Sequence, residues 1–107
     1  MPVIAALSVT PLGEADIDEE VAKAVDALEA FDVSYETHAM ETTIEAPDME
    51  TLLAAVGAAH AAVDADRVST LLKVDDRRTG TRTAADKVAA VRDRLGREPR
   101  GHPSDAE

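Results

Sequence analysis

The chain has 107 residues, with 22 acids against 11 Lys and Arg and a formal net charge of −11. This length suits one domain, and the acidic field disfavours binding to nucleic acid or to anionic membrane surfaces. The absence of cysteine excludes disulfides, thiolate metal sites and cysteine nucleophiles. With one Phe, one Tyr and no Trp, the chain is not expected to build a site from stacked aromatic side chains.

Only three of the bases are lysines, whereas acids and small residues are abundant. Such a composition is typical of halophilic proteins, in which surface carboxylates hold water and cations and high salt screens their repulsion. Most of the acids are therefore interpreted as solubilising groups. The first residues lack a basic segment, and their apolar run is too short to span a bilayer, so we expect a cytoplasmic protein.

The first half of the chain predicts three strands and one helix. Residues 3–10 form an apolar run that Pro11 and Gly13 close, which is typical of a buried strand. Asp16 or Asp18 is expected to cap a helix that continues to about residue 31, with acids such as Glu20 on its exposed face. Residues 33–40 alternate and residues 42–46 form a short strand, so these two strands are expected to pair as a hairpin.

The second half predicts two further helices and one strand. A helix is expected from Pro47-Asp48 to about residue 63, and a fourth strand at residues 67–74. Thr83 is expected to cap a helix at residues 84–95 that ends at Gly96. The predicted domain spans residues 1–95, and residues 96–107 are expected to be a disordered acidic tail because they have no apolar pattern.

The element order βαββαβα predicts an α+β fold, a ferredoxin-like βαββαβ sandwich with an extra C-terminal helix. Its antiparallel four-stranded sheet is expected to have strands one and three in the centre and strands two and four at the edges. The first two helices cover one face of the sheet. The opposite face, which we call the far face, mixes apolar side chains with hydroxyls and charges. It is interpreted as an interface between copies of the chain, or as a ligand pocket beside such an interface.

Residues 75–78 read Asp-Asp-Arg-Arg at the exit of the fourth strand. Adjacent strand residues point to opposite faces, so Asp75 and Asp76 are not expected to chelate one metal ion. Asp76 and Arg78 are interpreted as a turn with an ion pair at the rim of the sheet. Asp75 is a candidate for a residue that stabilises a pocket or a contact between subunits.

No catalytic or metal constellation is predicted. His38 and His60 lie on different elements without a second ligand at helical spacing, which argues against a zinc site. The hydroxyls, among them Ser8 and Thr43, lack a nucleophile-elbow sequence.

Glu45 is the hardest acid to assign to the surface, because a charge on a central strand is costly unless it is paired or bound to a cation. One interpretation is an ion pair with Lys73 or with a neighbouring subunit. The other is a carboxylate that meets a cationic or amine-bearing ligand, with Thr43 and Ser8 adding hydrogen bonds.

Three stretches together resemble the small thiamine-binding, YkoF-like family: VTPLG at residues 9–13, YETHAMETTIEA at residues 35–46 and KVDDRR at residues 73–78. The resemblance covers about residues 2–95. It implies non-catalytic binding of thiamine or its hydroxymethylpyrimidine moiety by a homodimer or homotetramer whose protomers associate through their sheets. The family's Thr-x-Glu pattern maps onto Thr43 and Glu45, its tyrosine onto Tyr35 and its strand-end acid onto Asp75. The candidate ligand-binding residues are Ser8, Thr10, Tyr35, His38, Thr43, Glu45 and Asp75.

Thiamine carries a permanent thiazolium charge and an aminopyrimidine edge, which a carboxylate and hydroxyls can meet. Because no basic phosphate cradle is evident, we expect selectivity for the unphosphorylated vitamin. No metal or resident cofactor is predicted. The alternative is a structural or regulatory homo-oligomer without a small-molecule ligand.

Overall fold

The computed structural model describes residues 2–13 and 15–101. Its elements are β1 (Val3–Leu12), α1 (Ile17–Ala27), the short 3-10 helix η1 (Leu28–Ala30), β2 (Ser34–Thr37), β3 (Thr42–Ala46), α2 (Met49–Ala62), β4 (Arg67–Asp76) and α3 (Ala84–Leu95). The strands form one antiparallel sheet in the order β2-β3-β1-β4. The predicted α+β fold with β1 and β3 in the centre is therefore confirmed.

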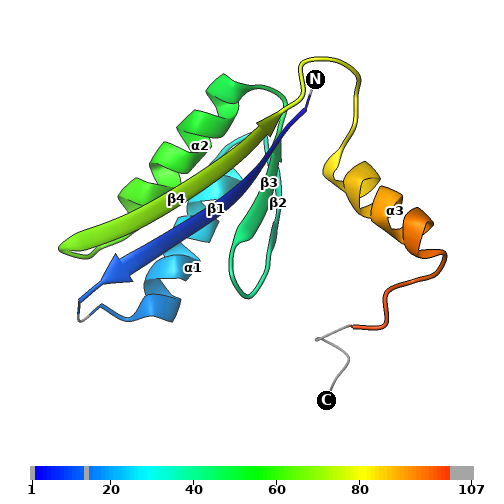
Figure 1. The fold of residues 1–107 in the computed structure, drawn as a ribbon. Helices are drawn as coiled ribbons and strands as arrows, with labels where there is room; N and C mark the ends of the chain where they lie inside the picture. The colour runs from blue at the N-terminus through cyan, green and yellow to red at the C-terminus, as the bar shows by residue number, and fades with distance from the viewer. Residues whose placement is uncertain (1, 14, 102–107) are drawn as a thin grey trace.

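Helices α1 and α2 cover one face of the sheet (Figure 1). In β1 alternate residues are buried, and this face meets Leu28 and Leu52 in the core. Ile44, Leu52, Ala55 and Ala59 are completely inaccessible to solvent. Burial of a side chain the size of Leu or Ile contributes about 1.5–3 kcal/mol, so this layer supplies much of the driving force for folding. Within the described residues, no helix has the length and apolar character needed to cross a membrane.

The helices begin at the predicted capping residues. Asp16 Oδ1 accepts from the backbone N–H of Glu19 at 3.1 Å, and Asp48 Oδ1 accepts from that of Thr51 at 2.7 Å. The contact with Thr51 holds the pKa of Asp48 below its ordinary value. Thr83 and Asp86 form a complete capping box at the start of α3.

Glu20 is buried, contrary to its predicted place on the exposed face of α1, with 6% of its surface accessible. Its carboxylate accepts from Lys23 Nζ at 2.8 Å and from the backbone N–H of Asp64 at 2.6 Å. Both contacts lower the pKa of Glu20, that with Lys23 more strongly. The side chain thereby joins α1 to the segment after α2, a partner 44 residues away that helical periodicity does not reveal.

The strand ends differ from the predicted ones. β1 continues through Pro11 to Leu12 and β4 reaches Asp76, because the two strands pair along their entire length. β2 stops at Thr37 instead of residue 40, since residues 38–41 form a turn in which His38 N–H donates to the Glu41 carbonyl at 2.8 Å. β3 pairs with β1 only as far as the Leu7–Thr42 partners. The last five residues of β1 thus extend beyond their neighbour β3.

Only the first part of the predicted tail lies within the described residues. Gly96 has a φ of +79°, which ends α3 as expected, and Arg92 Nε pairs with Glu98 at 2.5 Å. The predicted disorder of residues 102–107 concerns positions outside the described residues.

Candidate functional site

The register of the sheet places several predicted site residues in rows across the far face. Glu45 of β3 and Asp75 of β4 both lie opposite Ile4 of β1, so the two acids share one end of the sheet. Thr43 and Lys73 lie in the next row, on either side of Ala6. Lys73 and Asp75 are exposed, whereas Ile4, Thr43 and Glu45 are partly covered.

Glu45 is not paired with Lys73, which corrects one of its two predicted roles. Its Oε1 accepts from the backbone N–H of Ala84 at 2.7 Å, and no ion pair joins it to Lys73 in the part of the chain that the structure describes. The first turn of a helix presents backbone N–H groups without intrahelical partners and carries a partial positive charge. The N-terminus of α3 therefore supplies the partner that a carboxylate on a central strand requires.

Asp75 makes a second contact to α3. Lys87 Nζ donates to Asp75 Oδ2 at 2.6 Å, and this hydrogen bond holds the pKa of Asp75 below its ordinary value. The neighbouring Asp76 instead pairs with Arg78 Nε at 3.3 Å, so the predicted ion pair at the rim is confirmed. Asp75 and Asp76 serve different partners, as their opposite orientations on the strand require.

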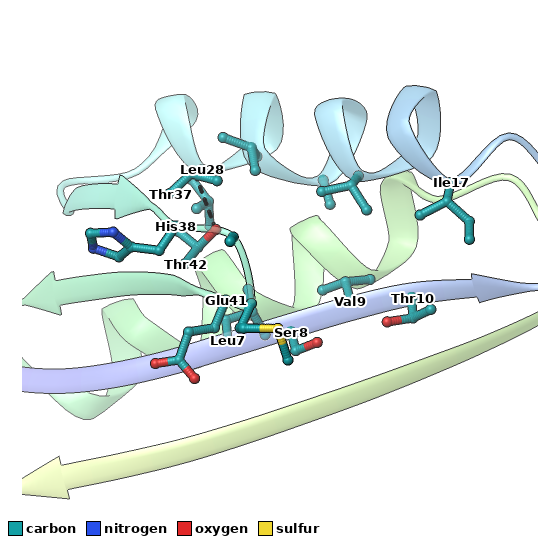
Figure 2. Close-up of a pocket in the computed structure, with 15 residues that line it drawn as sticks. Leu7, Ser8, Val9, Thr10, Ile17, Leu28, Thr37, His38, Glu41 and Thr42 are labelled. Atoms are coloured by element: carbon teal, nitrogen blue, oxygen red, sulfur yellow. Dashed lines mark hydrogen bonds between the residues drawn. The ribbon is translucent and has the colours of Figure 1, made fainter. Parts of the chain in front are cut away.

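The first of two hollows is a cavity of about 190 Å³, which we call the hairpin cavity. It lies between β1, α1 and the turn that joins β2 to β3, where β1 extends beyond β3 (Figure 2). Its walls are mainly apolar, formed by Leu7, Val9, Ile17, Val21, Ala24, Val25 and Leu28. Its polar lining consists of Ser8, Thr10, Thr37, His38, Glu41 and Thr42, and the Thr37 and Thr42 hydroxyls are 3.1 Å apart.

The second hollow, of about 330 Å³, is open on the far face, and we call it the far-face hollow. Ser8 and Glu41 line both hollows, so the two adjoin each other at these residues. The remaining residues of the far-face hollow are Ile4, Ala5, Ala6, Thr43, Leu71, Lys73, Asp75 and Lys87. A ligand with two linked rings can therefore place one ring in the hairpin cavity and the other over a surface that mixes apolar and charged side chains.

Five of the seven predicted site residues line these hollows. Thr10 and His38 line the hairpin cavity, Thr43 and Asp75 line the far-face hollow, and Ser8 lines both. The imidazole of His38 is half-exposed and lies 3.8 Å from the Glu36 carboxylate.

Two predicted site residues line neither hollow. Glu45 lies beside them under the start of α3, in contact with Ala84. Tyr35 lies opposite the fully buried Ile44, which places its side chain toward the helices. Its hydroxyl donates to Glu29, and this hydrogen bond raises the pKa of Tyr35. The Tyr35 side chain therefore points away from the face that carries Thr43 and Glu45, although all three residues line a further, shallower hollow beside the start of α3.

Three charged residues of these hollows, Glu41, Lys73 and Lys87, were not among the predicted site residues. Glu41 lies in the turn between β2 and β3 and lines both hollows. The sequence signal for it was its place in that turn, next to the strand that carries Thr43. Lys87 reaches the far-face hollow from α3, and only the tertiary fold reveals this. Lys87 and Lys73 together add positive charge to the far-face hollow, where no basic cluster was expected.

Over the described ranges, no group of three or more His, Asp or Glu side chains is arranged to hold a metal ion.

The chain is similar to proteins of known family. The sequence profile described as Thiamine-binding protein matches residues 5–92. The UPF0045 protein of Methanothermobacter thermautotrophicus is 44% identical over 98 residues, covering 87% of this chain and 99% of its own length.

Solved structures agree with this assignment. The crystal structure of the hypothetical protein MJ1052 from Methanocaldococcus jannaschii superposes with a TM-score of 0.78 at 36% identity, covering 84% of this chain and 95% of that one. A Thermotoga maritima protein provisionally assigned to thiamine biosynthesis or salvage has a TM-score of 0.74 at 23% identity. The superposition covers 86% of this chain and all of that one, so the two share the fold. The match over most of the chain and the identity to the Methanothermobacter protein together place this chain in the thiamine-binding protein family.

Proposed function

We propose that the chain binds thiamine or its hydroxymethylpyrimidine moiety, without catalysis, as a cytoplasmic homo-oligomer. One observation carries the proposal: a chain of the thiamine-binding family has an apolar cavity that adjoins, at Ser8 and Glu41, a second hollow whose lining includes Thr43 and charged side chains. Thiamine has the matching shape, a neutral aminopyrimidine linked to a cationic thiazolium. The Thermotoga protein of the same fold, provisionally assigned to thiamine biosynthesis or salvage, is consistent with this ligand class.

In this proposal the pyrimidine ring occupies the hairpin cavity. Its volume of about 190 Å³ suits one six-membered ring, since an apolar cavity of about 150 Å³ accommodates benzene. Leu7, Val9 and Leu28 contact the faces of the ring, while Ser8 and Thr10 hydrogen-bond to its nitrogens. Glu41 accepts a hydrogen bond from the exocyclic amino group, which no apolar wall can do.

The thiazolium ring then lies over the far-face hollow, beside Thr43. Glu41 and Asp75 offset its charge, and Lys87 is already paired with Asp75 at 2.6 Å. We further propose a preference for unphosphorylated thiamine, because the excess of acids repels additional phosphate charge. Lys73 is the residue that opposes this preference, which makes the diphosphate an informative comparison.

Isothermal titration calorimetry of the purified chain in high salt tests the proposal with three ligands: thiamine, hydroxymethylpyrimidine and thiamine diphosphate. We expect binding of the first two, with Glu41→Gln weakening the affinity by about tenfold or more, because a hydrogen bond to a charged group contributes about 1.5–3 kcal/mol. The control Glu50→Gln removes one exposed acid from α2, away from both hollows. If neither thiamine nor hydroxymethylpyrimidine binds at millimolar concentration, the proposed ligand class is wrong. Tighter binding of the diphosphate would reject only the preference.

The oligomer is part of the same proposal. Leu71 on β4 is 71% exposed, and Ile4 lies partly covered two rows away on the same far face. Exposed apolar side chains of this kind are ones that a second copy can bury. The alternative function, a structural or regulatory oligomer without ligand, requires the same assembly and no heat of binding. The titration above separates the two.

A further inference from the structure

The far-face hollow is lined by as many positive as negative side chains. Its charged residues are Glu41, Lys73, Asp75 and Lys87. Two carboxylates and two ammonium groups leave this surface without a net charge, although the whole chain carries −11. A cation that enters the hollow therefore meets an excess of negative charge only when one of the two ammonium groups moves away.

Lys87 is the ammonium group that already occupies one of these carboxylates. Its Nζ lies 2.6 Å from Asp75 Oδ2, and this contact is the main reason why the pKa of Asp75 lies below its ordinary value. The two side chains are 45% and 53% exposed. Because water screens an ion pair with this exposure, the pair contributes little to stability. One cation can therefore replace another at Asp75 at low cost.

The element that carries Lys87 is held loosely, whereas the element that carries Lys73 is held firmly. Within the described ranges, two hydrogen bonds join α3 to the sheet: Ala84 N–H donates to Glu45 at 2.7 Å, and Lys87 donates to Asp75. No residue of α3 is buried, and beyond its first turn the helix stands away from the sheet (Figure 1). Lys73 belongs to β4, which pairs with β1 along its whole length. Loss of the Lys87 contact therefore leaves α3 with one anchor and disturbs no strand pairing.

We propose that Lys87 competes with the cationic ring of the ligand: the thiazolium displaces Lys87 from Asp75, and this displacement loosens α3. The inference rests on the proposed function, because it concerns the ring that lies over the far-face hollow. An ammonium group is strongly hydrated and returns readily to water, whereas a ring cation with spread charge gains from contact with Ile4 and Leu71 in the same hollow. The pyrimidine ring in the hairpin cavity keeps the thiazolium at a high local concentration, which favours the exchange.

Calorimetry with a cationic and a neutral ligand isolates this role of Lys87. Lys87→Met removes the ammonium group and should strengthen thiamine binding by about two- to fivefold, the usual contribution of an exposed ion pair. Hydroxymethylpyrimidine has no thiazolium, and Lys87 does not line the hairpin cavity, so its affinity should not change. The matched control Arg94→Met removes a positive charge two turns further along α3, about 10 Å away, and should leave both affinities unchanged in high salt.

A spin label on α3 tests whether the displacement loosens the helix. The natural chain has no cysteine and Val91 is 65% exposed, so Val91→Cys takes a nitroxide label at a single position. Saturation with thiamine should narrow the spectrum of this label, because α3 keeps one anchor instead of two, and hydroxymethylpyrimidine should not. A label at Leu53→Cys on α2, where the natural side chain is 52% exposed, should respond to neither ligand.

The inference and the proposed function fail through different results. Absence of binding by both ligands would reject the two together. Thiamine binding with an affinity ratio to hydroxymethylpyrimidine that Lys87→Met leaves unchanged or lowers would reject only the inference, since Lys87 would then not compete with the thiazolium. A Val91→Cys label whose spectrum stays the same on saturation with thiamine would also overturn it.

Discussion

The surroundings of several individual residues depend on hydrogen-bonding partners that lie on other elements of the fold. Glu45, Glu20 and Tyr35 each find a hydrogen-bonding partner on another segment: Ala84, Asp64 and Glu29. The strand pattern correctly predicts that Glu45 needs a partner, because an unpaired charge on a central strand is unfavourable. It does not identify the partner, since the N-terminus of α3 reaches Glu45 only through the tertiary fold.

The pKa of Tyr35 can be measured directly, because it is the single tyrosine and the chain has no Trp. We expect the midpoint of the phenolate titration to lie above the ordinary pKa of 10, since the hydrogen bond to Glu29 favours the protonated phenol. In Glu29→Gln the titration should shift toward lower pH, whereas Glu50→Gln should leave it unchanged. Phenolate formation with the same midpoint in the natural chain and in Glu29→Gln would show that the contact is absent in solution.

Glu20 makes stability depend on pH at the acidic end. Its pKa in the folded chain lies below the ordinary value of 4.5, so its stabilisation is complete above that pH and is lost as the pH falls through the folded value. Glu20→Gln should lower the melting temperature at pH 7, because the ion pair with Lys23 is lost, and should have a smaller effect at pH 3. Melting curves at both pH values test this, with Glu19→Gln as the control for an exposed neighbour. An equal loss at both pH values would contradict the assigned cause.

At the scale of whole elements, α2 and α3 are opposite cases. Helix α2 buries Leu52, Ala55, Val56 and Ala59 against the sheet, whereas α3 buries no residue. Both were predicted from capping residues and apolar periodicity, which describe a helix but not the surface it meets. Local pattern therefore predicts that a helix forms, and tertiary packing decides how strongly it is held.

In α2, two adjacent leucines allow the contribution of burial to stability to be measured apart from that of helix propensity. Leu52 is fully buried and Leu53 is 52% exposed. Leu52→Ala should reduce the free energy of unfolding by about 2–5 kcal/mol, since it removes apolar burial and leaves a cavity. Leu53→Ala should change it by less than about 0.5 kcal/mol, as is usual for surface substitutions. Urea denaturation of the two variants measures the difference, and comparable losses would mean that α2 presents a different face to the sheet.

For α3, the two anchoring contacts should govern hydrogen exchange at its first turn. The substitution Glu45→Ala removes the carboxylate that accepts from the Ala84 N–H. Hydrogen exchange of that amide should therefore become several-fold faster. The backbone N–H of Thr51 in α2 donates to Asp48 in the same way. Its exchange rate should not change, so it serves as the internal reference. Unchanged exchange at Ala84 would indicate that α3 has another anchor.

At the scale of the whole molecule, the net charge of −11 means that the acidic side chains of a small protein repel one another. The Debye length falls from about 10 Å at 0.1 M salt to about 3 Å at 1 M, which suppresses this repulsion. We expect the melting temperature to rise by several degrees between these KCl concentrations, in line with the proposed halophilic character. A melting temperature that falls over this range would reject that interpretation.

The amino-acid sequence by itself determined the order of the elements, the helix caps and the family resemblance, all of which rest on local periodicity and short motifs. Tertiary structure decided the length of β2, the burial of Glu20, the contacts of Glu45 and Asp75 with α3, and the separation of Tyr35 from the far face. It also brought Ser8 of β1 and Glu41 of the turn into two adjoining hollows. The physical reason is that these features depend on which distant groups meet once the strands pair and the helices pack, and spacing along the chain carries no record of those distances.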